Sequence, residues 1–372
     1  MIEIEKEIDR VLKQYPNEIT LSKKELNPLI KLLSSDANFD IFNDHCHCLG
    51  ASTGICFNHE EEFPKQIILR AKEIGTKQTI NEIQSYISSS HIEMECALLL
   101  YNIQVDTEYT FSNGVKIINF YNLKDLKLVN FLSKEEMTMG GINTSLLVID
   151  YITKKEFFNS ISSKKMKSDW SKIKTKIELI QKLNETRFIL SLGRHHSYGI
   201  PVVGSFEIVP DNLKFLNNGI SFGPFSEPRT AFGPPIIELE LRNANDLLEN
   251  FELLSVEDKE KIKVALKRLN EAKIDPDWAN KCINLRICLE NLFCQKDDKY
   301  IKDTIAERAP NYLNFTKTRT KNIYKYLSTA VHTGVPGKHP EIKEKDIIRE
   351  IHKTIIQYIK NGGYPKWPQK KK

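Results

Sequence analysis

The chain has 372 residues, of which 40% are apolar, 28% charged and 9% aromatic. This composition excludes disordered, collagen-like and disulfide-scaffold proteins, and at about 150 residues per domain the length predicts two to three globular domains. The 54 Lys and Arg residues against 49 Asp and Glu give a net charge of +5, which permits binding to a polyanion without requiring it.

The start of the chain and the cysteines indicate in which cellular compartment the protein is expected. The opening Met-Ile-Glu-Ile-Glu-Lys lacks the pattern of a secretory signal, and no run approaches the roughly 20 apolar residues of a membrane-spanning helix. The seven cysteines are odd in number and lack the spacing of a secreted disulfide framework. We therefore expect reduced thiols, a cytoplasmic location and no membrane partner.

Residues 1–95 are expected to form a helical region. Apolar residues recur at helical spacing in the first twelve positions, and Ser22 with Glu25 forms a capping-box pattern before a second apolar stripe. A further amphipathic stretch covers 67–87. A loop rich in Cys and His, residues 44–59, separates these helices.

Residues 96–250 are expected to form an α+β domain. Ser-Asn-Gly at 112–114 lies between two alternating apolar and polar runs, which is the pattern of a β-hairpin. The Gly- and Pro-rich segment 217–235 is expected to be a loop. The other elements expected here are a helix at 168–190 and strands at 146–152, 202–209 and 236–241.

After residue 250 the strand patterns end. Helical periodicity is expected from Ser255, a capping residue, and then at 278–294, 316–332 and 341–360. Helices with connections of moderate length predict a helical bundle over 251–372. The fold class expected for the whole chain is thus α+β, with an N-terminal helical and mixed α/β region followed by an all-α bundle.

One face of the helix expected at 316–332 is polar and basic. Lys321, Lys325, Ser328 and His332 share this face, because offsets of four, seven and eleven residues are close to whole turns. A histidine in line with lysines could hold a phosphodiester and move a proton, although it could equally be an exposed residue that ends a helix. The stripe expected to face the bundle core is Ile323, Leu327, Ala330 and Val331.

The loop 44–59 contains six residues of types that bind zinc. Cys48, Cys56 and His59 with Cys46 could complete a tetrahedral structural zinc site, although the spacing matches no standard zinc module. The alternative is a loop without metal whose cysteines are partly buried. A polar segment elsewhere, Arg194-His195-His196, could bind phosphate or could simply link a helix to a strand.

Three stretches of the C-terminal half carry a resemblance to a known family. They are CINLRICLENLF at 282–293, YKYLSTAVHTG at 324–334 and GGYPKW at 362–367. In their order and spacing they resemble the Apea-like HEPN domain family, which is found in bacterial and archaeal anti-phage and toxin–antitoxin systems. The resemblance implies an HEPN-like bundle that forms a homodimer and cleaves RNA without a catalytic cofactor. It also implies a possible regulatory protein partner.

The family's Arg-x4–6-His motif supplies the expected catalytic residues. In that motif the histidine acts on the ribose 2′-hydroxyl and the arginine stabilises the charge that develops on the phosphate. His332 matches the histidine of the motif. Leu327 stands five residues before it, and none of the positions at the motif's spacing from His332 is an arginine. Lys325, seven residues before His332, is the candidate cationic substitute.

Further residues could complete this site. Glu290 matches a glutamate of the family pattern, and Arg286 stands one helical turn before it, so the two form either a structural salt bridge or a part of the site near His332. Together with Lys321 and Ser328, Lys338 would bind RNA. Because the motif arginine is missing, a catalytically degenerate HEPN protein that binds RNA or a protein partner is the alternative function. A zinc-dependent enzyme is a third possibility.

Overall fold

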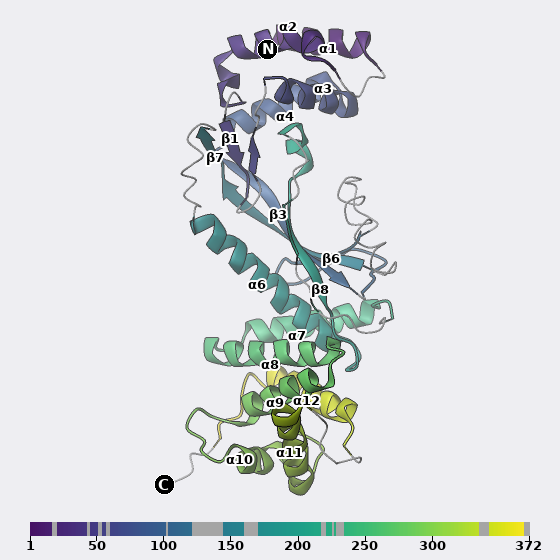
Figure 1. Cartoon of the computed structure of the whole chain (residues 1–372), viewed down its shortest axis with the longest axis vertical. Helices are drawn as coiled ribbons and strands as arrows, with labels where there is room; N and C mark the ends of the chain where they lie inside the picture. Colours follow the sequence, from purple (N-terminus) through teal and green to yellow (C-terminus); the bar gives the residue numbers. More distant parts are fainter. Residues whose placement is uncertain are drawn as a thin grey trace. The chain divides into compact units, whose positions relative to one another are not determined.

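The computed structural model describes residues 1–16, 21–42, 45–50, 54–56, 60–101, 103–120, 144–159, 170–216, 221–224, 227, 234–334 and 342–367. Over these residues the chain is a mixed α+β protein (Figure 1). It divides into two compact units. Unit 1 comprises Met1–Ala97, Ile149–Ile180 and Ser205–Gly223, and unit 2 comprises Leu98–Val148, Gln181–Gly204 and Pro224–Lys372. The segment 96–250 therefore contributes to both units, and 251–372 lies within unit 2.

Four helices form the N-terminal part of unit 1: α1 (Ile2–Gln14), α2 (Lys23–Ser35), α3 (Glu62–Ile74) and α4 (Thr76–Ser88). The expected capping box is present, since the backbone N–H and the hydroxyl of Ser22 donate to the Glu25 carboxylate at 2.6 and 2.7 Å. The amphipathic stretch expected at 67–87 is two helices, separated at Gly75, which has a φ of 90°.

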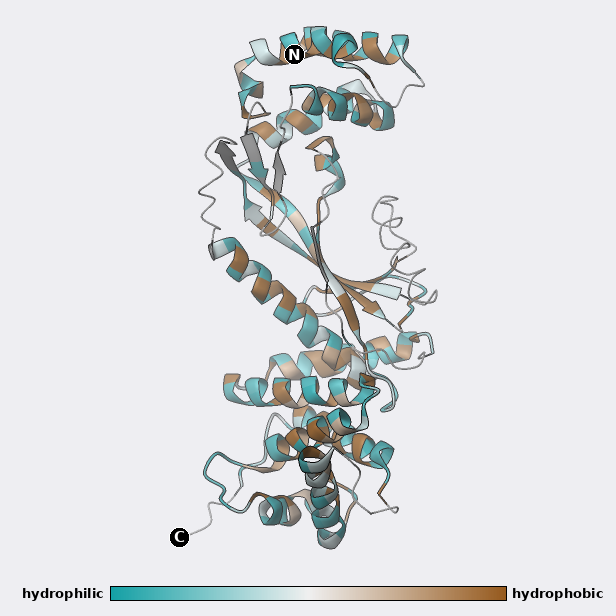
Figure 2. Ribbon diagram, viewed as in Figure 1, coloured by the Kyte–Doolittle hydropathy of each residue, from teal (hydrophilic) through white to brown (hydrophobic). Residues whose placement is uncertain are grey.

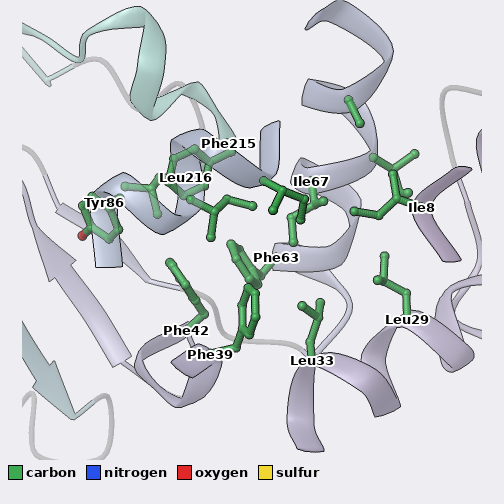
Figure 3. Close-up of a cluster of buried hydrophobic side chains, with 14 of the residues drawn as sticks. Ile8, Leu29, Leu33, Phe39, Phe42, Phe63, Ile67, Tyr86, Phe215 and Leu216 are labelled. Atoms are coloured by element: carbon green, nitrogen blue, oxygen red, sulfur yellow. The ribbon is translucent and has the colours of Figure 1, made fainter. Parts of the chain in front are cut away.

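The core of unit 1 joins these helices to a distant segment of the chain. A 3-10 helix, η1 (Ala37–Phe42), carries Phe42, whose ring stacks on Phe63 of α3 with centroids 3.9 Å apart. Figure 3 shows Phe215 and Leu216 beside this aromatic cluster. Both come from a second 3-10 helix, η4 (Asp211–Leu216), and are completely buried. Residues more than 120 positions apart thus build one core.

The strands of the described residues form two sheets. The strands β1 (His45–Cys48), β2 (Gly54–Cys56) and β7 (Glu156–Asn159) form a sheet in the order β2-β1-β7. The larger sheet has the order β4-β5-β6-β3-β8-β9. Its strands are β3 (His91–Tyr101), β4 (Tyr109–Thr110), β5 (Lys116–Asn119), β6 (Thr144–Lys154), β8 (Val202–Ile208) and β9 (Ser221–Pro224). The expected hairpin is confirmed as β4-β5, in which Tyr109 pairs with Ile117.

The strand expected at 236–241 is wrong. Helix α7 (Glu238–Glu252) begins there, and Ile237 and Leu239 are 58% and 62% exposed. The short alternation of apolar and polar residues resembles a strand, but burial follows the helical period, as the buried residues of α7 demonstrate: Leu241, Ala244, Leu247, Leu248 and Phe251. The helix expected at 168–190 is confirmed as α6 (Trp170–Gly193).

The remaining helices belong to unit 2: α8 (Val256–Ile274), α9 (Trp278–Phe293), α10 (Ile301–Arg308), α11 (Lys317–Thr333) and α12 (Glu344–Lys360). Four of the five were expected, and α10 was missed because it has only eight residues. The Ser255 hydroxyl caps α8 by accepting from the Asp258 N–H at 3.1 Å. Helix α9 packs against both α8 and α11, and Figure 2 shows hydrophobic and hydrophilic residues alternating along these helices.

Membrane spans were sought among the helices of the described residues. None of these helices has the length and apolar character needed to cross a bilayer.

Candidate functional site

Helix α11 carries the polar face that the sequence singles out. Its start is capped by the Thr316 hydroxyl, which accepts from the Arg319 N–H at 3.2 Å, and it ends at Gly334, whose φ of 66° is left-handed. His332 lies in the last turn and is exposed. The local sequence therefore forms the helix that presents the expected histidine to solvent.

The opposite stripe of α11 faces the interior of unit 2. Ile323, Leu327 and Ala330 are at most 2% exposed, as expected. Val331 was expected to join them but is 38% exposed, because it lies at the edge of the stripe near the helix end. Position 327 consequently belongs to the core and does not share a face with His332.

The two lysines of the polar face differ in their surroundings. Lys321 Nζ lies 2.7 Å from a carboxylate oxygen of Asp303 on α10, and this hydrogen bond lowers the pKa of Asp303. Lys325 is exposed and forms no ion pair with any residue that the structure describes. Lys325 is therefore the more available cation on this face.

A polar cluster connects α9 with α11. Arg286 Nε donates to Glu290 Oε1 at 2.7 Å, and the Tyr324 hydroxyl donates to the same oxygen at 2.6 Å. The Arg286 guanidinium carbon lies 5.4 Å from the centroid of the Tyr324 ring. The two charged residues are neither deeply buried nor fully exposed, with 26% and 33% of their side chains accessible. Arg286 and Glu290 thus form a salt bridge and also meet α11 through Tyr324.

Tyr324 is a member of this site that sequence reasoning missed. Burial and then the hydrogen bond to the Glu290 carboxylate raise its pKa to about 12, so the phenol keeps its proton near neutrality. Tyr324 stands four residues before Ser328, hence on the same side of α11. The spacing of Tyr324 and Ser328 could be read from the sequence. The sequence did not indicate that Glu290, on another helix, would accept a hydrogen bond from Tyr324.

Ser328 lies between Tyr324 and His332 on α11. Its Oγ is buried, and no hydrogen-bond partner for it exists among the described residues. A buried hydroxyl without a partner is costly unless a ligand or water satisfies it. The structure therefore brings Arg286 and Glu290 to α11 at Tyr324, one helical turn before Ser328, and no contact among the described residues joins His332 to this cluster. Lys338 lies outside the described residues.

The loop of the expected zinc site contains two paired strands. Cys46 pairs with Cys56, and Cys48 pairs with Gly54, across β1 and β2. The side chains of these three cysteines, and His59 altogether, lie outside what the structure describes. His47 is completely buried and its Nδ1 lies 2.7 Å from the Tyr86 hydroxyl. The described side chains include no group that could hold a metal, so zinc stays a prediction.

The segment Arg194-His195-His196 follows α6 in unit 2. Arg194 is buried and donates to the carbonyl of Pro234 at 2.5 Å, whereas His195 is exposed. The Arg194 guanidinium thus already forms a hydrogen bond to the backbone of the protein. Its availability for phosphate is accordingly limited.

A buried basic pair lies in the core of unit 2. Lys273 Nζ donates to the Ser191 carbonyl at 3.0 Å and to its hydroxyl at 3.1 Å, and lies 3.3 Å from His352 Nδ1. Burial lowers the pKa of Lys273 to about 7 and that of His352 to about 2. The imidazole of His352 is therefore neutral near pH 7.

Comparison of the chain with protein-family models, with curated proteins and with solved structures found no match.

Proposed function

We propose that α9 and α11 form an HEPN-like site that binds RNA and cleaves it without a metal cofactor, with His332 as the acid–base residue. The observation that supports this proposal is that Tyr324 of α11, one helical turn before Ser328, donates to Glu290 of α9, which also accepts from Arg286. In keeping with the resemblance, the chain would act in anti-phage defence or as a toxin. The bundle would form a homodimer.

The proposed reaction needs a base and a cation. His332 removes the proton of a ribose 2′-hydroxyl, the oxygen attacks the adjacent phosphorus, and the bond to the 5′-oxygen breaks. The products are a 2′,3′-cyclic phosphate and a 5′-hydroxyl, to which a proton returns. Because the nucleophile belongs to the substrate, no metal is required to generate it.

Lys325 is the proposed cationic partner of His332. The two residues are seven positions apart on one face of α11, which is about 10 Å along the helix axis. Leu327 is completely buried, so an arginine at that position would face the core instead of the substrate. The leucine is therefore compatible with a site whose cation stands at position 325.

Binding without cleavage is the second candidate function. It is favoured by the charge pairing of two cations of the proposed site: Arg286 is paired with Glu290 and Lys321 with Asp303. Paired cations stabilise a developing negative charge less than free ones do. In that case the same surface would hold RNA or a protein partner.

The decisive experiment is incubation of the full chain with RNA in the presence of a chelator. We expect His332→Ala to abolish cleavage and to leave the folded structure intact, because His332 is exposed. The matched control is Thr333→Ala, the exposed neighbour, which should cleave at the wild-type rate. Mapping of the new ends checks for 2′,3′-cyclic phosphates.

The two candidate functions separate in this experiment. Intact RNA with wild-type protein that nevertheless binds RNA, with binding weakened by Lys325→Ala, would favour the non-catalytic function. Cleavage that survives in His332→Ala would reject the assignment of this residue.

A further inference from the structure

One face of α12 is basic. Lys345, Arg349 and Lys353 follow one another at intervals of four residues and therefore share this face; we call them the α12 row. Lys345 and Lys353 are exposed, and Lys345 forms no ion pair with any residue that the structure describes. The row is about 12 Å long, which is roughly the length of three or four stacked nucleotides. It thus has the extent needed to contact several phosphates.

The carboxylates that pair with the α12 row are less exposed than its cations. Arg349 Nη1 lies 3.2 Å from Asp346, and Glu350 Oε1 lies 3.1 Å from Arg349 Nε and 3.5 Å from Lys353 Nζ. The two acidic side chains are 21% and 4% accessible, against 41% and 64% for Arg349 and Lys353. Glu350 also accepts from the Asn314 backbone N–H at 3.0 Å. An anion that approaches from solvent therefore meets the cations before the carboxylates.

A further arginine adjoins the α12 row from the start of α11. Arg319 Nη2 lies 4.0 Å from Asp346 Oδ2, and the same carboxylate pairs with Arg349. The third acidic residue of α12, Glu344, accepts from the Tyr326 hydroxyl at 3.3 Å. With Arg319, the surface combines four cations with two partly or completely buried carboxylates, which leaves it positive.

A histidine loop lies beside the α12 row. His195 and His196 follow α6, and the ring centroid of His196 lies 6.5 Å from that of His352, the residue before Lys353. Burial, and then the charges of neighbours that include Arg349 and Lys353, lower the pKa of His196. The loop after α6 and the basic face of α12 are therefore neighbours within unit 2.

The loop offers aromatic rings to solvent. The centroids of the His195 and His196 rings are 4.0 Å apart, and the Tyr198 ring lies 5.8 Å from His195. His195 is exposed and the other two are half-buried. Proteins hold single-stranded nucleic acid with this combination of side chains, because cations contact the phosphates while aromatic rings, histidine included, stack on unpaired bases.

An anionic membrane is a poorer partner for the same surface. Helices that bind a membrane surface bury large apolar side chains in the boundary of the bilayer. The structure describes every residue of α12, and no large apolar side chain of this helix is exposed. The cations of α12 thus lack the apolar neighbours that insertion requires.

From these features we infer that the α12 row, Arg319, His195 and His196 bind a single strand of nucleic acid, with its phosphates on the cations and its bases against the histidine rings. RNA and DNA share this chemistry. Arg319 stands thirteen residues, or about three and a half turns, before His332 and lies on another face of α11. The inference goes beyond the proposed cleavage, because it uses none of the residues proposed to cleave RNA.

The test is fluorescence anisotropy of labelled single-stranded RNA and DNA of one sequence, titrated with the full chain at several salt concentrations. Every protein carries His332→Ala so that cleavage cannot consume the RNA. One variant combines Lys345→Ala with Lys353→Ala. Its matched control combines Lys24→Ala with Lys31→Ala, which removes two exposed lysines from α2 in unit 1.

We expect the α12 variant to bind about tenfold or more weakly than its parent. The slope of log K against log salt should fall by about 1.4, since each phosphate contact to a single strand contributes about 0.7. The α2 control should keep both the affinity and the slope. His196→Ala should weaken binding about tenfold and leave the slope unchanged, because it removes a stacking ring and no charge at neutral pH.

Binding of either oligonucleotide with this dependence supports the inference, and binding of RNA alone would identify RNA as the strand. Equal losses in the α2 control, or no binding at all, would overturn it. Binding to phosphatidylserine vesicles and to neither oligonucleotide, with the same dependence on Lys345 and Lys353, would also overturn it. RNA binding that depends on Lys325 and not on these two lysines would reject the inference and leave the proposed cleavage standing.

Discussion

Lys325 is an exposed cation two helical turns before His332. Its role can be tested by one substitution that removes the charge and one that keeps it. Lys325→Ala is expected to lower kcat/KM for RNA about 10- to 100-fold, since a hydrogen bond to a charged group contributes about 1.5–3 kcal/mol. Lys325→Arg should retain the rate or raise it, because a guanidinium binds a phosphate with two parallel hydrogen bonds. Single-turnover cleavage measures both.

The control for this pair is Lys360→Ala, which removes an exposed lysine at the end of α12. An equal loss in Lys360→Ala and Lys325→Ala would assign the effect to overall charge. Unchanged cleavage in Lys325→Ala would contradict the role of the residue.

The buried His352 predicts a loss of stability in acid. Its pKa is about 2 in the folded chain and about 6.5 when unfolded, so below pH 6.5 the unfolded chain binds a proton that the folded chain does not. Stability therefore falls as the pH drops through this window, by up to about 1.4 kcal/mol per pH unit. With His352→Gln the loss between pH 7 and pH 5 should be smaller by about 2 kcal/mol, as measured by urea unfolding.

A matched histidine serves as the control for this experiment. His195→Gln changes an exposed residue and should keep the pH dependence of the wild type. If His352→Gln loses as much stability as the wild type between the two pH values, the buried histidine is not the group responsible.

At the scale of elements, the backbone conformation of Gly75 ends α3 and allows α4 to begin. Its φ of 90° is accessible to glycine at little cost, and no atom lies within 4 Å of where a Cβ would stand. With a ψ of 151° the residue lies in a region that is essentially restricted to glycine, so Gly75→Ala should destabilise the chain by about 1–3 kcal/mol through backbone strain, without a steric clash. Thermal unfolding measures this, with the exposed Lys77→Ala as control, expected to stay within about 0.5 kcal/mol of wild type. A neutral Gly75→Ala would argue against a constraint at this junction.

Elements with a complete local pattern could be predicted from the sequence, and those without it could not. Helix α8 combines a capping serine with a long apolar stripe, and the hairpin β4-β5 contains a turn sequence, so both were expected. Helix α7 begins with a short alternating run that mimics a strand, and the correct period emerges only over its full length. Helix α10 is too short to show a period at all.

At the scale of the whole molecule, unit 1 is made of three separate segments of the chain, so a single N-terminal fragment does not contain all of it. The fragment 1–97 lacks Leu213, Phe215 and Leu216, which are buried in its core. We expect this fragment to show no cooperative thermal transition, since a large apolar side chain removed from a core costs about 3–5 kcal/mol. In the full chain, Phe215→Ala should cost a similar amount. A fragment 1–97 with a sharp transition and a dispersed NMR spectrum would contradict the division of the chain.

The candidate site was only partly predictable. The face of α11 with Lys325 and His332 follows from the helical repeat, and the pairing of Arg286 with Glu290 follows from their spacing of four residues on α9. Tyr324 and Asp303 were missed, because each joins the site through a contact between helices, and contacts of that kind have no signature in a single sequence.

The sequence by itself therefore determined the periodic elements, the polar face of α11 and the mixed α+β class, because these depend on interactions among residues a few positions apart. The tertiary structure decided that Leu327 lies in the core, that Glu290 accepts from both Arg286 and Tyr324, and that unit 1 is built from three separate segments. Each of these depends on which elements pack together, and burial in a core is a property of the whole chain.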